Sequence, residues 1–70
     1  MKVIDLHGVI HEDVETVLDF ACRTYEAPFY VITGHSTRMK ELVSVYVKAR
    51  GFVACPAIGN QGRLVINESR

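Results

Sequence analysis

An aspartate and a histidine near the beginning of the chain could together carry out acid–base chemistry. Asp5 and His7 stand two residues apart, alternate with apolar residues and precede Gly8. On a β-strand, two such side chains share a face at a separation of about 6–7 Å. A nearby carboxylate can orient an imidazole and raise its basicity, as a general base requires. Strand-end hydrogen bonds also explain the spacing, which by itself favours that simpler interpretation.

A second polar stretch leads from an apolar run into a helical pattern. Gly34 ends the run, and Ser36 or Thr37 can cap the helix that follows. Free N–H groups and the partial positive charge of a helix N-terminus suit a phosphate or another anion. The local alternative is that Gly34 only makes a tight turn and the hydroxyl only caps. The candidate phosphate-binding residues are Gly8, Thr33, Gly34, His35, Ser36, Thr37, Arg38, Lys40 and, after the polar turn 59–62, Arg63.

The histidines do not form a metal-binding pattern. His7 and His11 have the four-residue spacing of a helical metal pair, but Gly8 lies between them where the strand ends. That spacing is suitable only on a helix. Asp5, His7 and His35 could meet in space, although nothing in the sequence requires it. We therefore expect no cofactor; the sequence leaves a divalent metal ion open but does not indicate one.

Composition and charge limit the class of protein. The chain has 70 residues, enough for one domain over 1–70, and 49% are hydrophobic. The formal net charge is zero, which argues against a strongly electrostatic, non-specific coat on nucleic acid. Cys22 and Cys55 form no C-x-x-C pattern and are expected to be free thiols in a reducing compartment. Without a signal peptide or a long apolar span, we expect a cytoplasmic protein with no membrane partner.

The elements that must position these residues follow from periodicity and from breakers. Residues 2–7 alternate as a strand, with Asp5 and His7 on one face, and an apolar stripe with a three- and four-residue repeat predicts a helix over about 12–25. Residues 29–33 are a buried strand by composition, and a second helix follows over about 37–50, closed by Gly51. Residues 52–55 and 63–66 are expected to be strands joined by the turn 59–62. The predicted order is βαβαββ.

Topology rules then restrict the arrangement. Right-handed crossovers make the first three strands parallel, and the fourth is antiparallel as a hairpin partner. If both helices cover one face, the result is an α+β two-layer sandwich with one sheet face open. Asp5 and His7 then point to that open face. Ligands gather beyond the carboxyl ends of parallel strands, so the two polar stretches are expected to lie together.

Three stretches of the chain resemble the Smr (small MutS-related) domain family. Residues 3–8 (Val-Ile-Asp-Leu-His-Gly) resemble its Leu-Asp-Leu-His-Gly opening, and residues 31–34 (Val-Ile-Thr-Gly) match the Ile-Thr-Gly before its glycine loop. The Gly-Asn-Gln-Gly turn at 59–62 and the apolar 64–66 resemble its closing turn and strand. The family is similar in fold to the C-terminal domain of bacterial translation initiation factor three, which implies the strand order 1-2-4-3. The resemblance also implies binding of DNA or RNA and, in some members, nicking by an endonuclease, with Asp5 and His7 as the catalytic residues.

The second motif departs from the family pattern. The family has Thr-Gly-x-Gly, often followed by His-Ser, whereas Thr33 and Gly34 are followed directly by His35 and Ser36. Either Ser36 replaces the second glycine, or about three loop residues are missing. The second alignment keeps histidine and serine in register with the helix. The shorter loop leaves open an alternative, a non-catalytic module that binds a protein partner at the open sheet face or at the strand ends.

Overall fold

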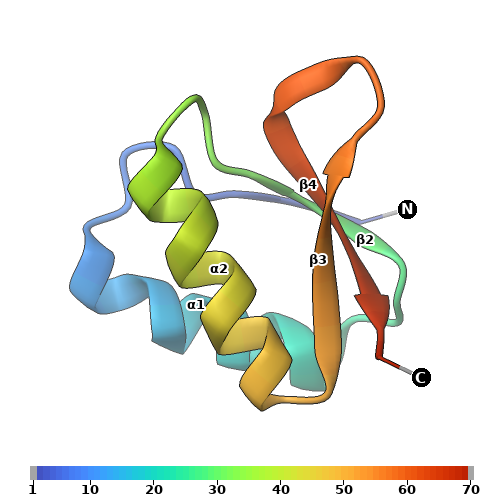
Figure 1. Ribbon diagram of the computed structural model, residues 1–70. Coiled ribbons are helices and arrows are strands. Elements are labelled where there is room, and N and C mark those ends of the chain that lie inside the picture. Colours follow the sequence, from blue (N-terminus) through green and yellow to red (C-terminus); the bar gives the residue numbers. More distant parts are fainter. Residues whose placement is uncertain (1, 70) are drawn as a thin grey trace.

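The computed structural model describes residues 2–69 and confirms the predicted order of helices and strands (Figure 1). A four-stranded mixed sheet has the order β1-β2-β4-β3. β1 pairs with β2 in parallel, and β4 is antiparallel to both β2 and β3. The elements are β1 (Val3–Asp5), α1 (His11–Thr24), β2 (Phe29–Ile32), α2 (Thr37–Ala49), β3 (Phe52–Ala57) and β4 (Asn60–Glu68).

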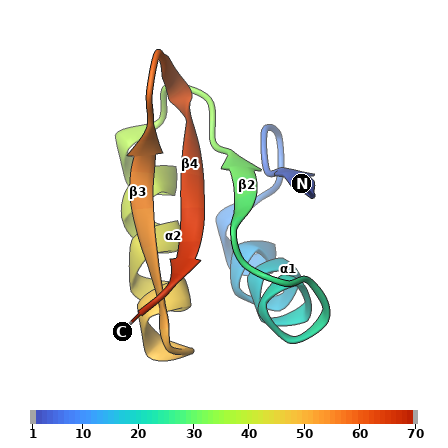
Figure 2. The ribbon, with the colours of Figure 1, turned by 90° about the vertical axis from the view of Figure 1, so that its right-hand side faces the viewer.

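Both helices cover the same face of the sheet, as expected for the two-layer α+β sandwich. Figure 1 shows α1 and α2 together on one side of the strands, and Figure 2 looks onto the other side, where the strands lie in front. The apolar stripes of the helices account for this arrangement. The buried core consists of Leu6, Val14, Leu18, Ala21, Phe29, Val31, Met39, Val43, Val47, Leu64 and Ile66.

The ends of α2 follow the predicted capping chemistry. The Ser36 hydroxyl accepts a hydrogen bond from the Met39 N–H at 3.0 Å. At the other end Gly51 has a φ of 84°, and its N–H donates to the Lys48 carbonyl at 3.1 Å. Glycine adopts this left-handed conformation without steric cost, which stops the helix and turns the chain into β3.

One arginine ties the two helices together. The Arg50 guanidinium donates from Nε to Asp19 Oδ1 at 3.1 Å and from a terminal nitrogen to Glu15 Oε2 at 3.2 Å. Its other terminal nitrogen donates to the Tyr46 carbonyl at 2.9 Å. The hydrogen bond to Asp19, followed by that to Glu15, raises the pKa of Arg50 above its ordinary value. Arg50 therefore links the end of α2 to two successive turns of α1.

The hairpin is tighter than the sequence predicts. The expected turn covered 59–62, but only Ile58 and Gly59 lie outside the strands, and Asn60 already pairs with Ala57. Gly59, with a φ of 76°, closes the turn. Residues 60–62 thus extend β4, and a register shift between Pro56 and Ala57 accommodates the irregular pairing.

β1 is shorter than the predicted strand over 2–7. It ends at Asp5, although the Leu6 N–H still donates to the Ile32 carbonyl at 2.8 Å. The Asp5 carboxylate accepts a hydrogen bond from the His7 N–H at 2.8 Å, which bends the chain away from the sheet. A short polar side chain that bonds to the backbone two residues on is a common way to start a turn.

Within residues 2–69, no helix combines the length and the apolar character that crossing a membrane requires. In the same part of the chain, no three His, Cys, Asp or Glu side chains are grouped so that they could hold a metal ion. The thiol of Cys22 is half-buried on α1, and burial raises its pKa.

Candidate functional site

Three segments distant in sequence meet where β1 and β2 end. The Gly62 carbonyl accepts hydrogen bonds from the N–H groups of Thr33 at 2.8 Å and Gly34 at 3.0 Å. A Cβ placed on Gly62 would lie 3.4 Å from the Gly34 Cα, so the two backbones are in contact. We call His7, Gly34, Gly62 and the first turn of α2 the strand-end site.

His7 reaches this site from the turn after β1. A Cβ placed on Gly34 would lie 3.6 Å from His7 Cδ2, so the imidazole ring lies beside the Gly34 backbone. His7 is exposed to solvent. Gly8, with a φ of 85°, supplies the left-handed backbone that directs the chain towards α1. The two polar stretches therefore lie together at one end of the sheet.

Asp5 and His7 contact each other differently from the predicted carboxylate–imidazole pair. The bond that joins them runs from the His7 backbone N–H to Asp5 Oδ1. Through this hydrogen bond the Asp5 carboxylate fixes the position of the His7 main chain, from which the imidazole side chain extends. The strand-end hydrogen bond that the spacing itself favoured is present. Asp5 is thus a positioning residue in this geometry.

Two other candidates act on the backbone of the site. Thr33 is buried, and its hydroxyl donates to the Gly34 carbonyl at 2.9 Å, with the Gly62 carbonyl at 3.4 Å. The Ser36 hydroxyl accepts from α2, and the Gly34 N–H is bonded to Gly62. The remaining donors for an anion are the N–H groups of the first helical turn, at Thr37 and Arg38, which lack a carbonyl one turn earlier. His35, which is exposed, lies between Gly34 and this turn.

The three predicted cations do not converge. Arg38 is exposed and lies 3.9 Å from Glu41. Lys40, with Thr37, lines a cavity of 410 Å³ between α2 and the strands β3 and β4. Arg63 lies opposite Ile32 in the sheet, one residue beyond Gly62. Arg63 thus directly follows Gly62 of the strand-end site, whereas Arg38 lies beside Glu41 and Lys40 lines a separate cavity.

Arg63 belongs to the uncovered face of the sheet. Burial alternates along β2 and β4: Val31 and Leu64 are buried under the helices, whereas their neighbours are only partly covered. The residues of β1 and β3 are assigned to a face by their partners in β2 and β4, because residues paired across two strands point to the same face of the sheet. This face, called the open face, consists of Val3, Asp5, Tyr30, Ile32, Val53, Cys55, Arg63, Val65 and Asn67.

A groove of 510 Å³ lies on the open face beside the β3–β4 hairpin. Within it the Arg63 guanidinium lies over the Tyr30 ring, 5.0 Å from the ring centroid. Tyr30 and Asn67 were not among the residues predicted from the sequence, although their alternation with buried neighbours was an available signal. The lining residues are Tyr30, Cys55, Pro56, Ala57, Ile58, Asn60, Arg63, Val65 and Asn67.

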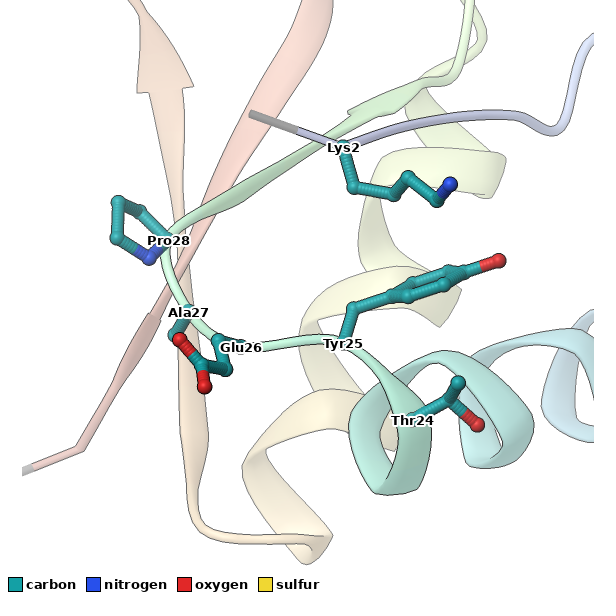
Figure 3. A pocket seen from close by; sticks show the side chains of 6 residues that line it. All are labelled: Lys2, Thr24, Tyr25, Glu26, Ala27 and Pro28. Carbon is teal, nitrogen blue, oxygen red and sulfur yellow. The ribbon is translucent and has the colours of Figure 1, made fainter.

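A further cavity, of 490 Å³, lies at the opposite end of β1 and β2 (Figure 3). The Lys2 ammonium group lies over the Tyr25 ring at 5.1 Å from its centroid. Thr24, Glu26 and Pro28 complete most of its lining. Because the Lys2 carbonyl bonds to the Tyr30 N–H at the start of both strands, this cavity is separate from the strand-end site.

Comparison with protein-family models, with curated proteins and with solved structures finds no match to this chain.

Proposed function

We propose that this protein binds nucleic acid and seats a backbone phosphate at the strand-end site. One observation carries the proposal: the His7 ring lies beside Gly34, where β2 leads into α2. An imidazole and the unpaired N–H groups of the first helical turn thus occupy the same end of the sheet. Together they offer donors and partial positive charge to a phosphate. The resemblance of residues 3–8 and 31–34 to the Smr motifs supports the same function.

The geometry favours binding over hydrolysis. Cleavage of a phosphodiester requires an activated nucleophile and stabilisation of the charge that develops on oxygen. The first turn of α2 and His7 provide donors, but the Asp5 carboxylate bonds to the His7 backbone instead of orienting its ring. Nicking activity with His7 as the base is therefore tested alongside binding and is not required for it.

Replacement of His7 tests the proposal directly. We expect His7→Ala to weaken binding of short single-stranded and duplex DNA or RNA about tenfold at low salt, the size of a charge-assisted hydrogen bond. Fluorescence anisotropy gives the affinity, and relaxation of supercoiled plasmid reports nicking. His11→Ala is the matched control, because His11 is an exposed histidine at the first position of α1.

The expected result is a loss for His7→Ala and none for His11→Ala. No binding of any nucleic acid by the wild-type protein at low salt would refute the proposal. Equal affinities of wild type and His7→Ala would show that His7 does not contact the bound phosphate.

A second candidate function is docking of a protein partner. The observation that favours it is apolar exposure on and beside the open face: Val3 is 45% exposed, Val53 41%, and Ile58 at the tip of the hairpin is fully exposed. The zero net charge agrees with a partner that is not strongly charged. Salt separates the two functions, because each phosphate contact makes affinity fall as salt rises, whereas contacts between apolar surfaces release no counterions.

A further inference from the structure

We propose that the open-face groove holds a nucleobase stacked against Arg63, from the same strand whose phosphate lies at the strand-end site. This inference rests on the proposed function and assigns a base-binding role to Tyr30, Asn60 and Asn67. The ligand that these residues would recognise is a flat heterocycle joined to a phosphate.

A flat cationic surface is already in place. The Arg63 guanidinium lies over the Tyr30 ring, and this contact restricts its position more than that of a free side chain. Its Nε is buried and has no hydrogen-bond partner within residues 2–69. Unstacked bases are bound on guanidinium planes and on aromatic rings in the same way. Arg63 and Tyr30 together offer both kinds of surface.

The charge of Arg63 is uncompensated. Arg23, Arg38 and Arg50 each pair with a carboxylate. Arg63 is the remaining arginine within residues 2–69, and no carboxylate there pairs with it. None of the nine residues that line the groove is acidic. Asp5 is on the same face but two strands away, bonded to the His7 backbone. An electron-rich or anionic ligand therefore complements the groove.

Two amide side chains supply hydrogen bonds at the edges of the groove. Asn60 and Asn67 both line it. Asn60 Oδ1 accepts from the Gly62 N–H at 3.0 Å, which leaves its NH₂ group as a donor. Amides can donate to and accept from the polar edge of a base. The groove volume of 510 Å³ lies within the range of small-ligand sites.

The groove and the strand-end site are adjacent along β4. Gly62 contacts the Gly34 backbone, and the next residue in β4 is Arg63. One nucleic-acid strand can thus place a phosphate beside His7 and a base against Arg63 without crossing a helix. A duplex cannot offer a base face in this way, so the inference selects single strands.

Substitution of Tyr30 tests the stacking surface. We expect Tyr30→Val to weaken binding of a single-stranded oligonucleotide about tenfold, because the Arg63 guanidinium loses the ring that supports it and the groove loses its aromatic surface. Tyr30→Phe keeps the ring and is expected to keep the affinity. Valine is favoured in strands, and circular dichroism verifies that each variant is folded. Unchanged binding by Tyr30→Val, with a loss in His7→Ala, overturns the base site but leaves the proposed function standing.

A charge change tests the groove independently of the ring. Asn67→Asp is expected to weaken oligonucleotide binding about tenfold, since it places a carboxylate in the groove. Thr16→Asp makes the same change of charge on an exposed position of α1 and is expected to have no effect. Equal losses in both variants would mean that overall charge, not the groove, determines binding.

NMR titration distinguishes binding of the base from binding of the sugar phosphate. Addition of a mononucleotide should shift the amide signals of Val65 and Asn67, and ribose 5-phosphate should not. Shifts with mononucleotides, but no binding of oligonucleotides, retain the base site and overturn the proposed function. Binding of an acidic peptide in place of nucleotides overturns the inference, because a carboxylate alone then satisfies Arg63.

Discussion

Gly34 occupies the most constrained position of the strand-end site. Its φ of 68° lies in the left-handed region, and the His7 ring lies beside it. Its N–H donates to the Gly62 carbonyl, and its own carbonyl accepts from the Thr33 hydroxyl. The conformation of this one residue therefore determines where the imidazole meets the start of α2.

At this scale we expect Gly34→Ala to destabilise the protein by about 1–2 kcal/mol, the cost of a left-handed conformation for a residue with a Cβ. The added methyl group itself fits, since it would lie 3.6 Å from His7 Cδ2. Gly34→Asn is the matched variant, because asparagine tolerates this region better, and it should lose less. Urea denaturation measures both free energies of unfolding. Equal stability of Gly34→Ala and wild type would contradict the backbone argument.

The two helices depend on each other through the end of α2. Arg50 is 22% exposed and reaches Glu15 and Asp19 on α1. Arg23 also contacts Asp19, at 3.0 Å, but its side chain is 74% exposed. Solvent screens the exposed pair, and the half-buried guanidinium with three partners contributes more. The helix layer is thus held by Arg50 in addition to the apolar core.

At the element scale we expect Arg50→Met to lower the free energy of unfolding by about 1–2 kcal/mol, after allowance for solvent around Glu15 and Asp19. Arg23→Met should cost less than about 1 kcal/mol, because exposed pairs contribute little. Thermal denaturation is a sensitive measurement here, since 1 kcal/mol changes Tm by roughly 4–8 °C in a domain of this size. A larger loss for Arg23→Met than for Arg50→Met would refute the assignment.

The whole molecule presents few cations to a nucleic acid. Its formal net charge is zero, and the positive groups near the strand-end site lie on different surfaces. Arg38 lies beside Glu41, and Lys40 lines the cavity along α2. His7, Arg63 and the first turn of α2 therefore supply most of the attraction. Binding should depend on a small number of local contacts and not on a broad basic surface.

At this scale we expect a shallow salt dependence. Contacts with about two or three phosphates of a single strand predict that log K falls with log salt with a slope of roughly −1.5 to −2. A salt titration of oligonucleotide affinity measures this slope, and Arg63→Gln should make it less steep. A slope steeper than about −4 would require a basic surface that residues 2–69 do not present.

Much of the fold was predictable because it depends on local rules. The repeat of Val14, Leu18 and Ala21 predicted α1. The Ser36 hydroxyl, one of the two expected, caps the start of α2, and Gly51 ends it through a left-handed backbone. Handedness of the crossovers led to three parallel strands, and the expected sandwich with both helices on one face is the arrangement observed. The strand order 1-2-4-3 was expected from the resemblance to Smr domains, and the observed sheet has that order. The predicted length of the hairpin turn was wrong, because residues 60–62 pair with β3 or contact Gly34 instead of forming a turn.

By itself, the sequence determined the helices, the caps of α2 and the presence of polar residues after two strands. Only the tertiary structure decided which atoms of those residues meet. The Asp5 carboxylate holds the His7 main chain, Gly62 contacts Gly34, and Arg63 lies over Tyr30. Gly34 and Gly62 are far apart along the chain, and the pairing of β2 with β4 brings them together. No turn joins β2 to β4, so their register depends on how their buried faces pack against the helices, which is a property of the tertiary structure.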